Sequence, residues 1–268
     1  MKDLSRPRVR LDRAKVHSQK FGEVWHSFVK EEEPYYPIVT TDDDGEGTIF
    51  VRASNSFPGE QLSLHFGEML YQLRAALDSL VYEVAILDSG CDPPPNEEQL
   101  EFIIRDSAEK FDNAAWKIKP LSDQHRAMIH SVQPYDIDQR GEAEAIVASA
   151  LNELNDLARK DRHRGLRVIA SWISNKNPSI ETLPPGCSLE WLKVTEDGLL
   201  KEEGEVASFK IRGWLPEHEL EANPNCAIDV AIEDAGPPLH DGDTLFSRTR
   251  MMIGCVSEVI RGFEESFD

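Results

Sequence analysis

LSLHFGEMLYQLRAALDSLVYEV, residues Leu62 to Val84, carries the strongest periodic pattern in the chain. Its apolar residues recur at three- and four-residue steps, which is the spacing of one face of an α-helix. These positions are Leu62, Phe66, Met69, Leu70, Leu73, Ala76, Leu77, Leu80, Val81 and Val84. The pattern predicts a helix that begins near Pro58 and ends near Leu87, ahead of a loop with three consecutive prolines.

Three further stretches have helical periodicity. We expect one helix over about Arg8–Glu32, before Pro34, and another from about Gly141 to beyond Ala158. The last is a closing helix with an apolar stripe over Leu245–Phe263. Short helices are expected between them, over 98–135.

The remaining pattern is typical of β-strands. YYPIVTTDDDGEGTIFVRAS, at 35–54, places two β-rich runs around an Asp/Gly cluster and predicts a hairpin. From Val168 onward, four more β-rich runs are separated by turn residues. Because the strands cluster and do not alternate with helices, we predict an α+β fold. A helical bundle layer is expected to pack with an antiparallel β-sheet, and the C-terminal helix is expected to return to the bundle.

Domain organisation is expected to be simple. We interpret 1–268 as a single α+β domain, with a subdivision into a mainly helical part at 1–166, a mainly stranded part at 167–242 and a helix at 243–268. The formal net charge of −20 favours solubility and argues against broad binding to nucleic acid. The sequence offers neither a membrane span nor a secretory signal, so we expect a cytoplasmic protein without a membrane partner.

A basic segment stands out against this acidic background. RKDRHRGLR, residues Arg159 to Arg167, surrounds Asp161 with five Lys or Arg residues. If the preceding helix continues to Arg164, Asp161 falls within about 10° of the centre of its apolar stripe, and Arg162 and Arg164 flank it. His163 then lies on the opposite side. A carboxylate that points toward a core needs a partner.

The helix predicted around Leu62–Val84 offers such a partner. Arg74 lies at the border of the apolar stripe, and Asp78 is one turn further on, where it can pair with Arg74. We predict that Arg74 reaches across a helix–helix contact toward Asp161. The resulting cluster comprises Arg74, Asp78, Asp161, Arg162, His163 and Arg164. It has two interpretations, an ion pair that fixes helix packing or a small polar pocket for a phosphate or carboxylate group.

No metal site and no cofactor are predicted. His125 and His130 lie five residues apart and do not share a helical face, so we interpret them as part of a surface helix. Glu217-His218-Glu219 lacks a second histidine at the spacing of a metal motif, and His65 is interpreted as a boundary residue of its helix. Phosphate-binding and nucleophile-elbow motifs are absent from the sequence.

The segment Gly67–Ser79, GEMLYQLRAALDS, resembles the motif G-D-x-L-H-N-L-R-S-A-L-D-H of an uncharacterised bacterial family. That family has a second motif of the form L-N-x-L…D-K-H-R, matched here by Leu151–Leu154 and Asp161–Arg164. Its Arg-x4-His spacing is similar to the signature of HEPN ribonucleases, which implies helical structure and RNA chemistry. This chain has Arg74 at the arginine position and Ser79 at the histidine position.

These observations favour a cytoplasmic binding or interaction protein with an Arg/Asp cluster between helices. The alternatives are an enzyme of phosphoryl chemistry such as a HEPN-like ribonuclease, and a binder of a small anionic ligand. We expect a small anionic ligand or a protein partner, with homodimer formation as a further expectation. RNA remains an alternative partner that the acidic net charge disfavours.

Overall fold

The computed structural model describes residues 4–30, 34–54, 57–135, 137, 141–165, 168–174, 176–199, 203–232 and 244–267. Its α-helices are α1 (Ser5–Val29), α2 (Gly59–Ser89), α3 (Ala108–Ala114), α4 (Asp123–Ser131), α5 (Glu142–Arg164) and α6 (Leu245–Glu265), with the 3₁₀-helices η1 (Glu97–Gln99) and η2 (Ala115–Ile118). Its strands are β1 (Tyr35–Thr41), β2 (Glu46–Ala53), β3 (Val168–Ser174), β4 (Ser179–Thr182), β5 (Ser188–Val194), β6 (Gly198–Leu199), β7 (Glu203–Arg212), β8 (Glu221–Asn223) and β9 (Ala227–Ile232). The α+β prediction is confirmed.

The chain divides into two compact units, each assembled from separate segments. A helical unit comprises 1–22, 63–166 and 246–268, and a strand-rich unit comprises 23–62 and 167–245. The N-terminal hairpin therefore belongs with the later strands, whereas the predicted subdivision placed it with 1–166. The described helices include none that is both long and apolar enough to cross a membrane.

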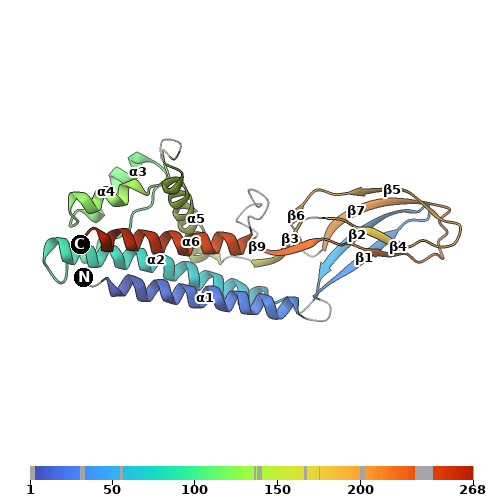
Figure 1. The fold of residues 1–268 in the computed structure, drawn as a ribbon, viewed down its shortest axis with the longest axis horizontal. Helices are drawn as coiled ribbons and strands as arrows, with labels where there is room; N and C mark the ends of the chain where they lie inside the picture. The colour runs from blue at the N-terminus through green and yellow to red at the C-terminus, as the bar shows by residue number, and fades with distance from the viewer. Residues whose placement is uncertain are drawn as a thin grey trace. The chain divides into compact units, whose positions relative to one another are not determined.

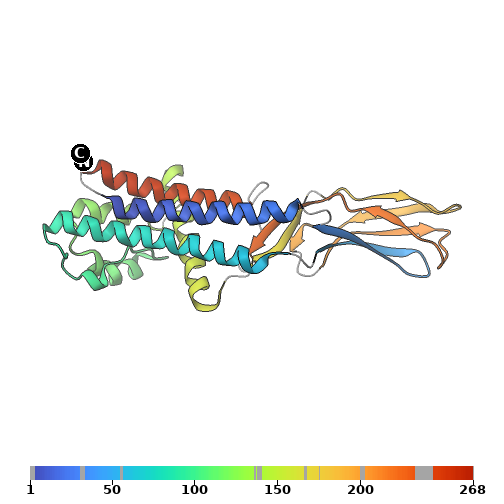
Figure 2. The same ribbon diagram turned by 90° about the horizontal axis from the view of Figure 1, so that it is seen from below.

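The helical unit is built on the stripe that the sequence predicts for α2. Figures 1 and 2 both show α1, α2 and α6 side by side. The predicted α2 positions are all buried, each at 1% exposure or less. The C-terminal helix returns to this unit as expected, because Phe246 stacks edge-on against Phe21 of α1 and Arg248 pairs with Glu153 of α5 at 3.5 Å. Burial of these apolar faces is the main stabilising contribution to such a bundle.

The first helix differs slightly from its predicted bounds. It spans Ser5–Val29, although the pattern placed it at about Arg8–Glu32. Its first turn is held in place by the burial of Leu4 and by an ion pair between Arg8 and Glu264 of α6. Residues 31–33, over which the predicted helix ended, lie outside the described residues.

The strand-rich unit contains an antiparallel sheet with the order β1-β2-β7-β5 (Figure 1). Two smaller sheets have the orders β6-β3-β9 and β4-β8. The predicted hairpin is confirmed, with Thr41 paired to Gly47, and β2 then pairs with β7. A buried cluster forms the core of this unit, namely Ile49, Val51, Ile173, Val206, Ala207, Phe209 and Ile211.

The Asp/Gly cluster at the tip of the hairpin forms a tight turn. Asp42 Oδ1 accepts hydrogen bonds from the backbone N–H groups of Asp44 at 3.0 Å and Glu46 at 2.8 Å. Gly45 has a φ of 82°. A Cβ at Gly45 would collide with the backbone carbonyl of Ile211, so this position favours glycine both for its backbone angle and for lack of space.

Candidate functional site

Helix α5 brings Asp161 to α2, as its position on the apolar stripe predicts. The helix runs to Arg164, and the N–H of Gly165 donates to the Asp161 carbonyl at 2.9 Å. The Asp161 side chain lies against Gly67 of α2, where an added Cβ would lie 2.7 and 2.9 Å from the two carboxylate oxygens. Gly67 therefore allows the close approach of the two helices at this point.

Arg74 is a buried cation on α2 with incomplete hydrogen bonding. Its residue is 9% exposed. Nη2 donates to Asp78 Oδ1 at 3.3 Å and to the backbone carbonyl of Phe102 at 3.2 Å. Nη1 is buried and has no hydrogen-bond partner. Because a guanidinium has five donors and stays charged, an unpaired Nη1 leaves unsatisfied hydrogen-bonding capacity in the site.

Asp78 holds Arg74 from one side. Its Oδ1 also accepts the N–H of Phe102 at 3.0 Å, so one carboxylate oxygen serves two donors. Burial raises the pKa of Asp78, although the Arg74 charge and the Phe102 N–H act in the opposite direction. The side chain still has 42% of its surface exposed, so it lines a recess that solvent reaches.

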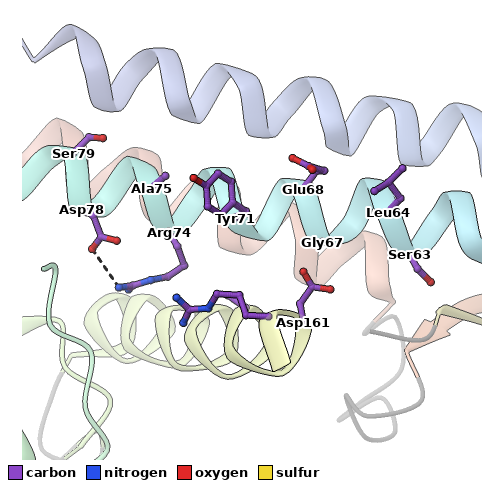
Figure 3. A pocket seen from close by; sticks show the side chains of 12 residues that line it. Ser63, Leu64, Gly67, Glu68, Tyr71, Arg74, Ala75, Asp78, Ser79 and Asp161 are labelled. Atoms are coloured by element: carbon purple, nitrogen blue, oxygen red, sulfur yellow. Dashed lines mark hydrogen bonds and ion pairs between the residues drawn. The ribbon is translucent and has the colours of Figure 1, made fainter. Parts of the chain in front are cut away.

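These side chains surround a cavity of about 470 Å³ between α2 and α5 (Figure 3). The cavity is lined by Ser63, Leu64, Gly67, Glu68, Tyr71, Arg74, Ala75, Asp78, Ser79, Ala158, Asp161 and Arg162. A second cavity of about 650 Å³ shares Arg74, Asp78 and Arg162 with it. Arg74, Asp78 and Arg162 therefore lie at the junction of the two recesses.

The structure brings together only part of the predicted cluster. Arg74, Asp78, Asp161 and Arg162 line the first cavity. His163 and Arg164 are exposed on the last turn of α5 and are not among the described residues that line either cavity. Figure 3 shows the Arg74 guanidinium directed toward Asp78 and the Asp161 carboxylate near Gly67. The direct pairing of Arg74 with Asp161 stays a prediction.

Sequence patterns did not identify several residues of the site. Tyr71 projects into the first cavity with 54% exposure, and Trp116 of η2 lines the second with 47% exposure. Beside Trp116, Lys117 forms an ion pair with Glu101. Although burial acts against it, this contact together with Arg105 lowers the pKa of Glu101. Only Tyr71 carries a sequence signal, since it is an aromatic residue on the polar border of the α2 stripe.

A separate buried polar network also escaped the sequence interpretation. His125, expected on a surface helix, is 3% exposed, whereas His130 is exposed as expected. His125 Nδ1 lies 2.7 Å from Asp88 Oδ2, and His125 Nε2 lies 2.8 Å from Ser266 Oγ. The surface interpretation is thus wrong for His125, because α4 turns this side chain toward carboxylate and hydroxyl partners on α2 and at the C-terminal end of α6.

The Asp–His–Ser order of this network resembles a hydrolase triad, but its surroundings indicate a structural role. Ser266 Oγ donates to the Phe263 carbonyl at 2.6 Å, so its proton is already engaged. The His125 ring packs against Phe263 and Phe267, with ring centroids 5.4 and 4.6 Å apart. A serine nucleophile also needs nearby N–H donors for an oxyanion, whereas the end of α6 presents carbonyl groups.

Comparison of the chain with protein-family models, curated proteins and solved structures yields no match. The cavity between α2 and α5 is the candidate functional site of the helical unit.

Proposed function

We propose that this chain is a non-catalytic binding protein whose α2–α5 cavity holds the anionic group of a small ligand at Arg74. The observation that carries the proposal is the buried, unpartnered Nη1 of Arg74 beside an open cavity. Leaving such a donor unsatisfied costs about 1–3 kcal/mol. A carboxylate or phosphate oxygen from a ligand would remove that cost and form a charge-assisted hydrogen bond.

Arg162 supports the same proposal. It lines both cavities together with Arg74, so two arginines border the junction. Glu68, Asp78 and Asp161 also line the first cavity, so anion binding there depends on the directed Nη1 donor of Arg74 and not on a positive net charge. Two arginines at one recess favour a planar, two-oxygen acceptor such as a carboxylate or a phosphate edge.

The lining of the first cavity indicates the chemistry of the part of the ligand that carries no charge. Leu64, Tyr71, Ala75 and Ala158 contribute an apolar lining next to the charged end. Small-molecule sites commonly combine an apolar wall with a few placed polar groups. An anion that carries a compact apolar or aromatic body fits this lining better than a bare inorganic ion.

The lining favours binding over the ribonuclease alternative. The described residues that line the two cavities include no histidine and no cysteine. Ser79, at the histidine position of the HEPN-like spacing, lines the first cavity. Phosphoryl chemistry of that type uses a positioned group that titrates near neutral pH, and serine does not.

A thermal-shift screen tests the proposal. The full chain would be heated with a panel of aryl carboxylates, mononucleotides and inorganic phosphate, because a ligand that binds only the folded state raises the melting temperature. We expect stabilisation by at least one organic anion, and none for Arg74→Gln. Arg159→Gln is the matched control, since Arg159 is an exposed α5 arginine paired with Asp156 at 2.8 Å.

The control outcomes separate the alternatives. Arg74→Lys keeps a buried charge and distinguishes loss of binding from loss of folding. An incubation with single-stranded RNA provides the catalytic arm. RNA cleavage that disappears in Arg74→Gln and persists in Arg159→Gln would overturn the non-catalytic assignment. Equal stabilisation of Arg74→Gln and the parent chain by every active anion would overturn the assignment of the site.

A further inference from the structure

A pair of histidines lies between two helices of the helical unit, apart from the Arg74 cavity junction. His17 of α1 and His65 of α2 face each other, with ring centroids 6.0 Å apart and ring planes at 43°. His17 is 8% exposed, and His65 is half-buried. Nearby, Arg10 Nη1 donates to Gln72 Oε1 at 3.1 Å, which confirms that polar groups of these two helices meet along this contact.

Both histidines leave the same atom unsatisfied. Nδ1 of His17 and Nδ1 of His65 are buried, and neither has a hydrogen-bond partner. A buried polar nitrogen without a partner destabilises the folded state. Two such nitrogens lie on adjacent rings, so one bound ion or molecule could be a partner to both. Both ring nitrogens of neutral histidine are established metal-ligand atoms.

We propose that His17 and His65 together bind a divalent transition-metal ion of the Zn²⁺ type. Zinc–imidazole bonds are about 2.0–2.1 Å long, so two imidazoles on one tetrahedral ion place their ring centroids about 5–6 Å apart. The spacing of 6.0 Å between the two ring centroids lies at the upper end of this range. Imidazole ligands suit zinc, copper and nickel ions, and do not suit calcium or magnesium.

Glu68 supplies the third protein ligand. It lies three residues after His65, on the same face of α2, and Figure 3 shows its side chain directed toward α1. Among the described residues, no three His, Cys, Asp or Glu side chains are already gathered for metal binding. The Glu68 carboxylate therefore joins the two imidazoles by side-chain rotation when the ion binds. No sequence pattern indicates this site, because its histidines come from separate helices without a motif spacing.

Cobalt binding to the chelator-treated full chain tests the site. Co²⁺ would be titrated while its visible absorption is recorded, and Zn²⁺ would be titrated by calorimetry. We expect one ion per chain and the strong visible bands of a four-coordinate cobalt site with nitrogen ligands. His17→Ala and His65→Ala should each weaken binding at least 10-fold, and Glu68→Gln should weaken it less. His26→Ala is the matched control on α1, because His26 lies more than two helical turns after His17 in that helix. This variant should bind the metal ion as the parent chain does.

The parent chain alone gives the decisive negative result. The proposal is overturned by an absence of Co²⁺ and Zn²⁺ binding up to about 100 µM, which corresponds to less than roughly 5–6 kcal/mol of binding free energy. It is equally overturned by a weak, six-coordinate cobalt spectrum, or by metal affinity that is unchanged in both histidine variants. Circular dichroism establishes that the variants are folded. If His17→Ala fails to fold, His65→Ala and the parent spectrum still decide the question.

Discussion

Replacement of His125 by alanine should destabilise the helical unit strongly. The imidazole links three elements, because it contacts Asp88 of α2 at 2.7 Å and Ser266 at the end of α6 at 2.8 Å from its own position on α4. The Asp88 side chain is only 10% exposed, and after the substitution its buried Oδ2 keeps the Ser122 N–H, at 2.7 Å, as a donor. The variant thus leaves a mostly buried carboxylate that has lost its imidazole partner.

The magnitude follows from these contacts. Truncation of a buried aromatic-sized ring to alanine costs about 3–5 kcal/mol, and the His125 ring packs on Phe263 and Phe267. Loss of the hydrogen bonds between the imidazole and Asp88 and Ser266 acts in the same direction. For a chain of this size, 3–5 kcal/mol corresponds to a decrease in melting temperature of roughly 6–20 °C.

Urea denaturation followed by circular dichroism measures this loss directly. His163→Ala is the control, because His163 is exposed on α5 and its removal should change the free energy of unfolding by less than about 0.5 kcal/mol. Ser266→Ala should cost less than His125→Ala, since it removes only one of the three polar contacts of the ring, which are to Ser122, Asp88 and Ser266. A loss below about 1 kcal/mol for His125→Ala would refute the structural role of the network.

Three further predictions concern the cavity and the hairpin. Gly67→Ala should cost about 1–3 kcal/mol and weaken ligand binding, because its Cβ would lie 2.7 Å from a carboxylate oxygen of Asp161; urea titration and calorimetry measure the two effects. Gly45→Ala should destabilise the strand-rich unit by at least about 1 kcal/mol, since φ is 82° there, and an unchanged urea midpoint would contradict this. Burial raises the pKa of Asp78, so this carboxyl takes up a proton in the folded chain at a higher pH than in the unfolded chain and favours folding as the pH falls through that pKa. Protonation also removes the negative charge beside Arg74, so anion affinity should rise as the pH falls through the raised pKa of Asp78, and calorimetry of Asp78→Asn should show tighter binding without that rise.

The apolar stripes of the long helices were predictable, because burial of one helical face imposes a period that the sequence must carry. The same periodicity predicted that Asp161 turns toward α2. On α2 the Asp161 carboxylate lies against Gly67, where the absence of a side chain allows the two helices to approach closely. An apolar stripe identifies large buried residues. It gives no indication of a position such as Gly67, whose importance comes from its lack of a side chain.

The unsatisfied Nη1 of Arg74 could not be predicted in this way. It depends on the backbone of Phe102. The Phe102 carbonyl accepts a hydrogen bond from Arg74 Nη2, and the Phe102 N–H donates to Asp78 Oδ1. The burial of His125 likewise depends on Asp88 and Ser266, which are distant in sequence. Pairing of β2 with β7 is a third long-range contact, and it places the hairpin in the strand-rich unit. Local periodicity carries no information about such partners.

Nuclear magnetic resonance of the arginine side chains tests the central claim most directly. With the best anion from the thermal-shift screen, we expect the guanidinium resonances of Arg74 to shift and its Nη1 protons to exchange with water more slowly, since Nη1 gains an acceptor. Arg159 provides an exposed reference that should not change. Saturating ligand that leaves the Arg74 resonances unaltered would contradict the assignment of this guanidinium as the anion-binding group.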